Sequence, residues 1–178
     1  MENYELKTGR PENRCEDENA VYDLLDQLHI PYEYVDHSPA STMELCRQVD
    51  EILYPAVICK NLLLCNTQKT NFFLLLLRED TKFRTSKISA QLNSSRLSFA
   101  PEEYLLKYLH TPSGSASITG LLFDKEHAVH LAVDRRVLEE EWFGCHPCRN
   151  TTSLRMRTKD VFEILVPYLG YTYTIIDA

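Results

Sequence analysis

Two apolar segments joined by a polar turn constrain the fold of this sequence most strongly. Residues 56–65 read A-V-I-C-K-N-L-L-L-C and residues 71–77 read N-F-F-L-L-L-L, with the turn N-T-Q-K-T between them. Apolar runs of this length, bounded by turn residues, predict two buried neighbouring strands. Lys60 shares a strand face with Ile58 and Leu62. Because an unpaired ammonium is costly among apolar side chains, Lys60 either reaches water from an edge strand or serves a functional site.

The rest of the sequence mixes patterns that predict helices with patterns that predict strands. Apolar residues recur at helical spacing in residues 21–30, 41–53, 85–92, 101–109 and 159–169. Shorter apolar segments predict strands at residues 32–35, 96–99, 128–133, 142–145, 152–156 and 171–176. Because no strict strand–helix repeat is present, we expect one α/β (α+β) domain with a mixed sheet surrounded by helices. The acidic residues 1–18 would lead into a domain covering residues 19–178.

Composition favours a soluble, cytoplasmic protein without a membrane partner. Of the 178 residues, 44% are hydrophobic and 25% are charged, as in ordinary globular domains. The first residues, M-E-N-Y-E-L-K-T-G-R, contain no apolar signal region. The longest strictly aliphatic or aromatic run, residues 72–77, is too short to cross a membrane. In the cytoplasm, the six cysteines are expected to be reduced thiols.

The net charge of −7 is unevenly distributed. Residues 1–55 hold 4 basic and 13 acidic residues, whereas residues 56–178 hold 15 and 13, a net of +2. The second part can therefore offer a local phosphate-binding surface, although a solvated surface of mixed charge is the simpler interpretation. The basic residues concerned are Lys82, Arg84, Lys87, Arg135, Arg136, Arg149, Arg155, Arg157 and Lys159.

Two short motifs could carry chemistry. The loop T-P-S-G-S-A-S-I-T-G at residues 111–120 is rich in small residues, and Gly114 can adopt a positive φ that brings backbone N–H groups close to a ligand. It matches neither a P-loop nor a dinucleotide-binding motif. The second motif, C-H-P-C at residues 145–148, has the spacing of a redox pair or half a zinc site. Because no second ligand pair is present, we predict no metal site.

Other forms of catalysis find little support. No Gly-x-Ser-x-Gly elbow is present, so a serine triad is not indicated. Cys59 lies next to Lys60 but on the opposite strand face, which weakens a Cys–Lys pair. His37 is expected to lie in a turn and to hydrogen-bond the backbone.

Several ordered segments resemble a known family. D-L-L-D-Q-L-H-I-P-Y-E-Y-V-D-H-S-P-A-S-T is similar to its opening helix, strand and His-containing turn, and C-K-N-L-L-L-C-N to the strand with its signature lysine. R-L-S-F-A-P-E-E-Y-L and P-S-G-S-A-S-I-T-G-L-L-F-D resemble its helix entry and substrate loop. H-L-A-V-D and C-H-P-C-R-N-T-T-S-L resemble its D…HPN-x-N-T-x-T region. These are the YbaK/ProX-type aminoacyl-tRNA deacylases, related to the editing domain of bacterial prolyl-tRNA synthetases, and the match spans residues 21–176.

The resemblance implies hydrolysis of the ester that joins a wrong amino acid to the tRNA 3′-terminal adenosine, without a cofactor. Lys60 would be the catalytic residue, orienting the terminal nucleotide or stabilising the oxyanion. The family mechanism is substrate-assisted, with a ribose hydroxyl placing the water. Around the substrate, Asn61 and His146 would border the aminoacyl pocket, Gly114 and Ser115 would offer backbone contacts, and Asn150 and Thr151 would brace the His146 loop.

The free-standing ProX/PrdX branch, which clears alanine from proline tRNA, has the closest pattern. The expected partners are the aminoacyl end and acceptor stem of a mischarged tRNA, with prolyl-tRNA synthetase as a further possibility. Cys148 replaces the usual Asn, and residues 115–118 replace a more apolar run, so the pocket lining and the amino acid chosen can differ. The alternatives are deacylation of Cys-tRNA(Pro) or Ser-tRNA, a non-catalytic module that binds aminoacyl-tRNA or a synthetase, and a thiol–disulfide protein using Cys145 and Cys148.

Overall fold

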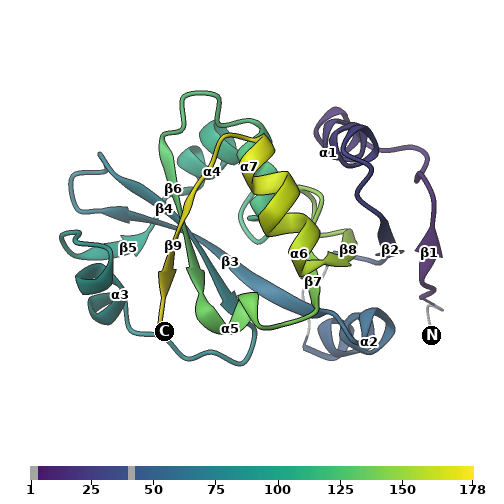
Figure 1. The fold of residues 1–178 in the computed structure, drawn as a ribbon, viewed down its shortest axis with the longest axis horizontal. Helices are drawn as coiled ribbons and strands as arrows, with labels where there is room; N and C mark the ends of the chain where they lie inside the picture. Colours follow the sequence, from purple (N-terminus) through teal and green to yellow (C-terminus); the bar gives the residue numbers. More distant parts are fainter. Residues whose placement is uncertain (1–3, 40–42) are drawn as a thin grey trace.

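The computed structural model describes residues 4–39 and 43–178 and is built on a mixed sheet of nine strands (Figure 1). The sheet order is β1-β2-β8-β7-β3-β4-β6-β9, with β5 paired to β3. The pairs β3–β7, β4–β6 and β6–β9 are parallel, and the other pairs are antiparallel. The strands are β1 (Lys7–Thr8), β2 (Tyr32–Asp36), β3 (Val57–Asn66), β4 (Phe72–Arg78), β5 (Leu97–Phe99), β6 (Val129–Asp134), β7 (Trp142–Cys145), β8 (Thr152–Arg157) and β9 (Tyr173–Ile176).

Helices cover both faces of the sheet. Figure 1 shows α3 near one end of the molecule and α1 and α2 near the other, while α6, η2 and α7 follow one another as a single helix across the sheet. Buried residues of α1, α4 and the α6–α7 helix join the largest apolar cluster, whereas α3 and α2 pack on two smaller clusters. The helices are α1 (Glu16–Gln27), α2 (Met43–Leu53), α3 (Thr85–Gln91), α4 (Glu102–Leu109), the 3-10 helix η1 (Ile118–Leu122), α5 (Arg135–Leu138), α6 (Thr158–Asp160), the π-helix η2 (Val161–Leu165) and α7 (Val166–Tyr168).

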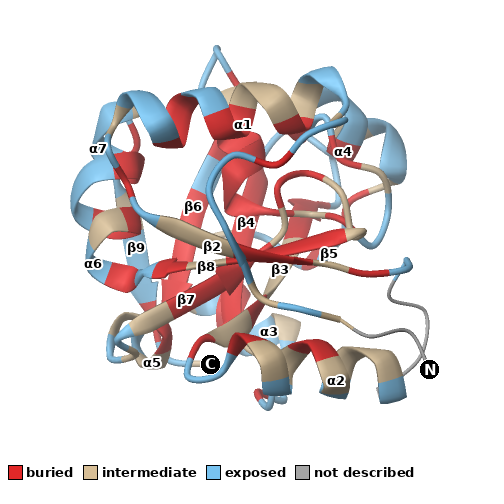
Figure 2. Cartoon of the chain, turned by 90° about the vertical axis from the view of Figure 1, so that its right-hand side faces the viewer, coloured by how far each residue is buried: buried red, intermediate tan, exposed pale blue. Residues whose placement is uncertain are grey.

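The β3–β4 hairpin forms the centre of the core, because alternate residues supply both faces of the sheet. On β3, Cys59 and Leu63 enter the largest cluster, whereas Leu62 and Leu64 face the second cluster with Leu75 of β4. Figure 2 shows the buried residues gathered on the central strands and the exposed residues on the outer surfaces of the helices. The expected single α/β domain with a mixed sheet is confirmed.

Some elements differ from the sequence-based expectations. Part of the acidic lead-in joins the fold, since β1 pairs with β2 and α1 already begins at Glu16. The predicted loop at residues 111–120 contains the start of η1, and α5 was not predicted. The predicted start of the helix at residues 41–42 lies outside the described residues. No helix within the described ranges is both long enough and apolar enough to cross a membrane.

Candidate functional site

The strand β3 is open along one edge, and this opening creates the candidate site. One side of β3 pairs with β4 over residues 59–65. The other side pairs with β7 at residues 57–58 and with β5 at residues 64–66, so within the described chain no strand covers residues 59–63 there. A cavity of about 420 Å³ occupies this opening. It is lined by Cys59, Lys60, Asn61, Leu62, Leu63, Phe99, Ala100, Leu105, Ser113, Gly114, Ala116 and His146.

A second, smaller cavity of about 210 Å³ lies beside the first. The two cavities share Cys59, Lys60 and His146, so these residues stand at their junction. The remaining residues of the smaller cavity are His37, Cys46, Val49, Asp50, Ile58, Glu79 and Ser153. A larger cavity of about 560 Å³, at the α5–β7 connection and the start of α6, contains none of the predicted site residues.

Lys60 is partly buried at this junction and has no carboxylate partner in the described part of the chain. Its Nζ donates to the main-chain oxygen of Thr81 at 3.4 Å, and it forms no ion pair with any described residue. A charge with a single weak neutral partner remains available to an anionic or strongly polar ligand. The edge-strand interpretation of Lys60 is partly right, since β3 is locally an edge, but the lysine faces a cavity there.

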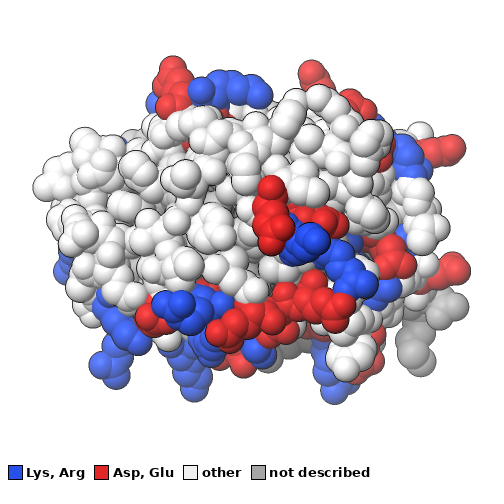
Figure 3. All heavy atoms as spheres, viewed as in Figure 1, with Lys and Arg blue, Asp and Glu red and all other residues white. Residues whose placement is uncertain are grey.

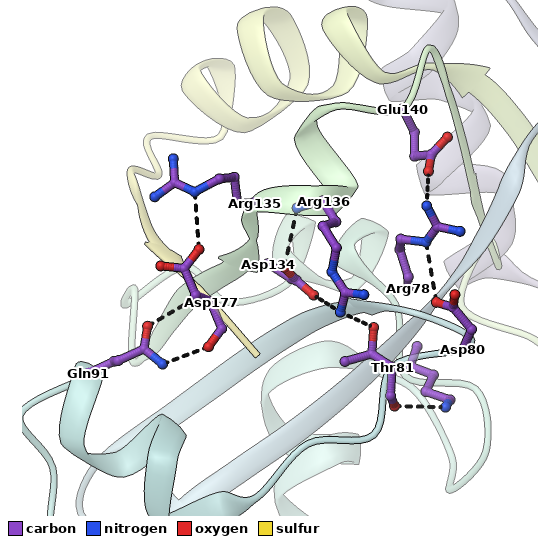
Figure 4. A network of polar contacts seen from close by, with 10 residues as sticks. Arg78, Asp80, Thr81, Gln91, Asp134, Arg135, Arg136, Glu140 and Asp177 are labelled. Carbon is purple, nitrogen blue, oxygen red and sulfur yellow. Dashed lines mark hydrogen bonds and ion pairs between the residues drawn. The ribbon is translucent and has the colours of Figure 1, made fainter.

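Thr81 is held in place by Arg136, which is in turn paired with the buried Asp134. The Oγ1 of Thr81 accepts a hydrogen bond from Arg136 Nη2 at 2.7 Å, and the same nitrogen donates to Asp134 Oδ2 at 2.9 Å. Figure 4 shows Arg136 lying between Asp134 and Thr81, near the neighbouring Arg78–Asp80 and Arg78–Glu140 ion pairs. Asp134 is fully buried at the end of β6. The position of the Lys60 acceptor therefore depends on the chain Asp134–Arg136–Thr81.

Asn61 attaches the edge of β3 that no described strand covers to the loop at residues 111–120. Its Nδ2 donates to the main-chain oxygen of Cys59 at 2.9 Å, and its Oδ1 accepts from the main-chain N–H of Ile118 at 2.8 Å. Both polar atoms of the side chain are thus used within the protein. Asn61 lines the larger cavity, but its amide acts here as a connector between two segments.

The loop at residues 111–120 brings Gly114 to the cavity and Ser115 behind it. Gly114 has φ +81, in the left-handed region that favours glycine. Ser115 is buried, its N–H donates to the Pro112 carbonyl at 3.0 Å, and its Oγ accepts from the N–H of Asn150 at 3.2 Å. The expected backbone contact from Ser115 is therefore already occupied inside the protein. Asn150 braces the two loops against each other.

Neighbouring residues fix the ring of His146 through Nδ1, while Nε2 has no hydrogen-bond partner among the described residues. Its Nδ1 lies 2.9 Å from the carbonyl oxygen of Thr152, and its own carbonyl accepts from the hydroxyls of Ser117 and Thr119. Burial lowers the pKa of His146 below its ordinary value, and the neighbouring His37 lowers it further. His146 is therefore neutral near pH 7. Thr151 supports the same region, since its carbonyl accepts from the N–H of His37 at 2.9 Å.

The C-H-P-C segment supplies structure around His146. Both thiols are fully buried, and burial raises the pKa of Cys145 and of Cys148 to about 12. Cys148 has φ +65, a conformation for which Asn is better suited than Cys, and its Sγ lies near Thr119 Oγ1. It lines neither cavity, so the expectation that Cys148 alters the pocket wall is wrong for direct contact. No three His, Cys, Asp or Glu side chains in residues 4–39 and 43–178 converge on a metal position.

The structure brings Lys60, Asn61, Gly114 and His146 to one cavity and places Ser115, Asn150 and Thr151 as supports. Sequence reasoning missed the roles of Thr81, Arg136 and Ser153. Thr81 lies in a polar turn and Arg136 in a basic pair, so neither carried a local signal. Ser153 sits in a strand whose pattern indicates only burial.

Comparisons with known proteins identify the family of the chain. The profile of the family described as "Aminoacyl-tRNA editing domain" matches residues 37–164. The chain is 30% identical over 158 residues to the prolyl-tRNA editing protein ProX of Acetoanaerobium sticklandii, covering 89% of this chain and 95% of that one.

Two solved structures share the fold. One, described as a candidate trans-editing enzyme for prolyl-tRNA synthetase, has a TM-score of 0.67 at 13% identity and covers 93% of this chain and 99% of that one. The other, the hypothetical protein APE2540, has a TM-score of 0.67 at 13% identity, covering 88% and 97%. The family profile, the relative and the shared fold lead to one conclusion: the chain belongs to the aminoacyl-tRNA editing domain family.

Proposed function

We propose that this protein hydrolyses the ester between a wrongly attached amino acid and the 3′ end of a tRNA, acting as a free-standing editing enzyme. The observation that carries the proposal is Lys60, whose ammonium stands at the junction of two cavities with one main-chain oxygen as its partner. Family membership and the 30% identical prolyl-tRNA editing protein support the same reaction.

The two cavities suit the two parts of an aminoacyl-adenosine. The larger, about 420 Å³, has the size range of small-molecule sites and would take the terminal adenosine. Phe99 in its lining is 63% exposed, an unusual state for a large aromatic and one that suits stacking on a base. The smaller, about 210 Å³, would take the amino acid. The scissile ester then lies beside Lys60.

The chemistry follows from this placement. Water adds to the ester carbonyl carbon, and the resulting oxyanion is stabilised by the Lys60 ammonium in a partly dry environment where charge acts strongly. A ribose hydroxyl of the substrate positions the water. Collapse of the intermediate breaks the bond to the ribose oxygen and releases the amino acid and the uncharged tRNA.

Alanine on proline tRNA is the preferred substrate in this proposal. A cavity of about 210 Å³ favours a small side chain, and the curated relative is named for prolyl-tRNA editing. An apolar pocket discriminates one methylene by only about 1–3 kcal/mol, so exclusion of the larger proline is more effective than attraction of alanine. Cysteinyl and seryl esters are the closest alternatives, because their side chains are nearly as small.

A basic segment beside the site would contact the acceptor stem. Lys82, Arg84 and Lys87 follow Thr81 in the chain, are exposed and form no ion pair with any described residue. By contrast, Arg149 and Arg155 are paired with Asp17 and Glu33. Figure 3 shows acidic and basic side chains interleaved over the lower part of one face, so that face carries no uniform positive patch. The free cations at residues 82–87 suit a few phosphates near the 3′ end.

The decisive experiment compares hydrolysis of alanyl-, cysteinyl-, seryl- and prolyl-tRNA(Pro) by the wild type and Lys60→Ala. Rapid loss of the alanyl ester alone, abolished by the substitution, supports the full proposal. Cleavage of another ester retains the mechanism and changes the substrate. If no ester is cleaved while tRNA still binds, the hydrolase proposal fails and the chain is a binding module.

A further inference from the structure

Three side chains, those of His146, Ser153 and His37, form a hydrogen-bonded line from the candidate site to the interior of the protein. The Oγ of Ser153 lies 2.9 Å from His37 Nε2 and 3.3 Å from His146 Nδ1, so the hydroxyl stands between the two rings. The ring centroids of the two histidines are 6.2 Å apart. All three residues line the smaller cavity, yet they come from three segments: the end of β2, the end of β7 and strand β8.

Main-chain carbonyls fix where the protons of this line reside. His37 Nδ1 lies 2.8 Å from the carbonyl oxygen of Ser38, and His146 Nδ1 lies 2.9 Å from that of Thr152. A carbonyl oxygen can only accept, so both Nδ1 atoms carry hydrogen. In the neutral His37 ring, Nε2 is then an acceptor, and the Ser153 hydroxyl donates to it. The Ser153 oxygen can in turn accept a share of the His146 Nδ1–H.

These hydrogen bonds determine the protonation of the remaining ring nitrogen, His146 Nε2. In the neutral ring this nitrogen carries a lone pair, and it has no hydrogen-bond partner among residues 4–39 and 43–178. Because Nδ1 is turned toward Thr152 and Ser153, Nε2 lies on the ring edge nearer the cavities that His146 lines. Both supporting side chains are buried, since Ser153 is 1% and His37 7% exposed, and this burial favours the unprotonated Nε2.

We propose that His37, acting through the Ser153 hydroxyl, is a positioning residue that prepares His146 to accept the proton of the attacking water. This inference rests on the proposed deacylation. As the water oxygen bonds to the ester carbon, one water proton passes to His146 Nε2. When the carbon–ribose oxygen bond breaks, that proton passes to the leaving ribose oxygen. The Ser153 oxygen and the Thr152 carbonyl together stabilise the Nδ1–H of the transient imidazolium.

The surrounding charges are compatible with a neutral resting ring. Lys60 of β3, Asp50 of α2 and Glu79 after β4 line the smaller cavity with His146, as do the thiols of Cys46 and Cys59. Burial and the neighbouring His37 lower the pKa of His146, whereas the hydrogen bond to Thr152 acts in the opposite direction.

The first test reads the ring directly by ¹⁵N NMR of the histidines in the full-length protein. We expect neutral His146 to show a protonated Nδ1 and an unprotonated Nε2, and Ser153→Ala to lower its pKa because an acceptor of the charged form is lost. An Nε2–H tautomer in the wild type would overturn the proposal. This readout is independent of activity, so it stands even where the proposed reaction fails.

The second test uses alanyl-tRNA(Pro) hydrolysis across pH. Ser153→Ala and His37→Leu should each lower kcat about 10- to 100-fold with little change in KM, and the double variant should be no worse than either. Ser153→Thr and His37→Gln, which keep a hydroxyl and an acceptor, should recover most of the rate. The acid limb of the Ser153→Ala profile should move to lower pH.

Ser89→Ala is the matched control, because Ser89 is a buried serine that bonds Thr85 and Leu97 and lines neither cavity. It should lose stability without moving the pH profile. A Ser153→Ala enzyme with wild-type kcat and an unchanged acid limb would reduce the line to a packing feature. Absence of hydrolysis by the wild type would instead count against the proposed function.

Discussion

The side-chain oxygen of Asn61 accepts a hydrogen bond from the main-chain N–H of Ile118 at 2.8 Å, joining the open edge of β3 to the loop that carries Gly114. The same amide donates to the Cys59 carbonyl. One side chain thus holds together two walls of the larger cavity. Its removal should affect both the stability of the fold and the shape of the site.

We expect Asn61→Ala to lower the free energy of unfolding by about 1–3 kcal/mol, because the Ile118 N–H loses its acceptor. KM for the ester substrate should rise as the loop loosens. Asn66→Ala is the control, since Asn66 accepts from Thr70 and Asn71 in the hairpin turn, away from the site. Urea unfolding and steady-state kinetics check both variants. Equal KM changes in the two would contradict a site-specific role for Asn61.

Removal of the Lys60 charge should separate activity from stability. Lys60→Met retains the apolar stem and is expected to lower kcat about 10²- to 10³-fold, the usual loss for one stabiliser of an oxyanion. Stability should be unchanged or higher, because the substitution removes a partly buried charge that pairs with no carboxylate among the residues the structure describes. Thermal unfolding and single-turnover hydrolysis measure the two quantities. Lys125→Met, at an exposed turn, should change neither.

The support that Arg136 gives to Thr81 predicts a smaller loss of activity when it is removed than when Lys60 itself is replaced. Thr81→Val removes the hydroxyl that Arg136 holds but keeps the main-chain oxygen that Lys60 contacts. We expect kcat to fall about 10-fold, less than for Lys60→Met, because the acceptor is displaced rather than lost. Thr81→Ser should restore the rate. A Thr81→Val enzyme as slow as Lys60→Met would mean that the ammonium position depends entirely on this contact.

Much of this arrangement follows from sequence patterns, and the limits of those patterns are physical. Alternation and turn residues were sufficient to predict the β3–β4 hairpin, because both runs are apolar on two faces. The short β1 escaped prediction, since two exposed residues acquire a strand conformation only by pairing with β2. The positive φ of Gly114 was predictable from its residue type. The role of Ser115 was not, because whether its N–H is free depends on the fold of its own loop.

The site residues also divide into those that sequence patterns reveal and those that only the fold brings together. Lys60 was identifiable because a charge among apolar strand residues violates the local pattern. Thr81, Arg136 and Ser153 violate no pattern, and they reach the site only through contacts between residues far apart in sequence. The separation of Arg136 from Thr81 is 55 residues, and that of Ser153 from His37 is 116. Supports of this kind depend on tertiary structure and leave no periodic signal.

A carboxyl pair in the smaller cavity should make stability depend on pH. Burial and the adjacent Glu79 raise the pKa of Asp50 to about 7 from 3.8. The folded state therefore keeps a proton that the unfolded chain releases, and this contribution, fully present below pH 3.8, is lost as pH rises toward 7. Asp50→Asn should be more stable than the wild type at pH 8, and the gap should close near pH 4. Urea unfolding across pH measures it, and Glu79→Gln should flatten the same curve. A gap independent of pH would exclude the raised pKa of Asp50 as its cause.

The buried thiols provide a test against the redox alternative. Burial raises the pKa of Cys145 and of Cys148 to about 12, so at pH 8 their thiolate fraction should be on the order of 10³-fold below that of an ordinary cysteine. Iodoacetamide should therefore modify the exposed Cys15 first in the native protein and reach Cys145 and Cys148 only after unfolding. Mass spectrometry of peptides labelled with and without guanidinium gives the comparison. Fast native labelling of either residue would revive the thiol–disulfide hypothesis, whereas protection of both leaves the C-H-P-C segment as the support of His146.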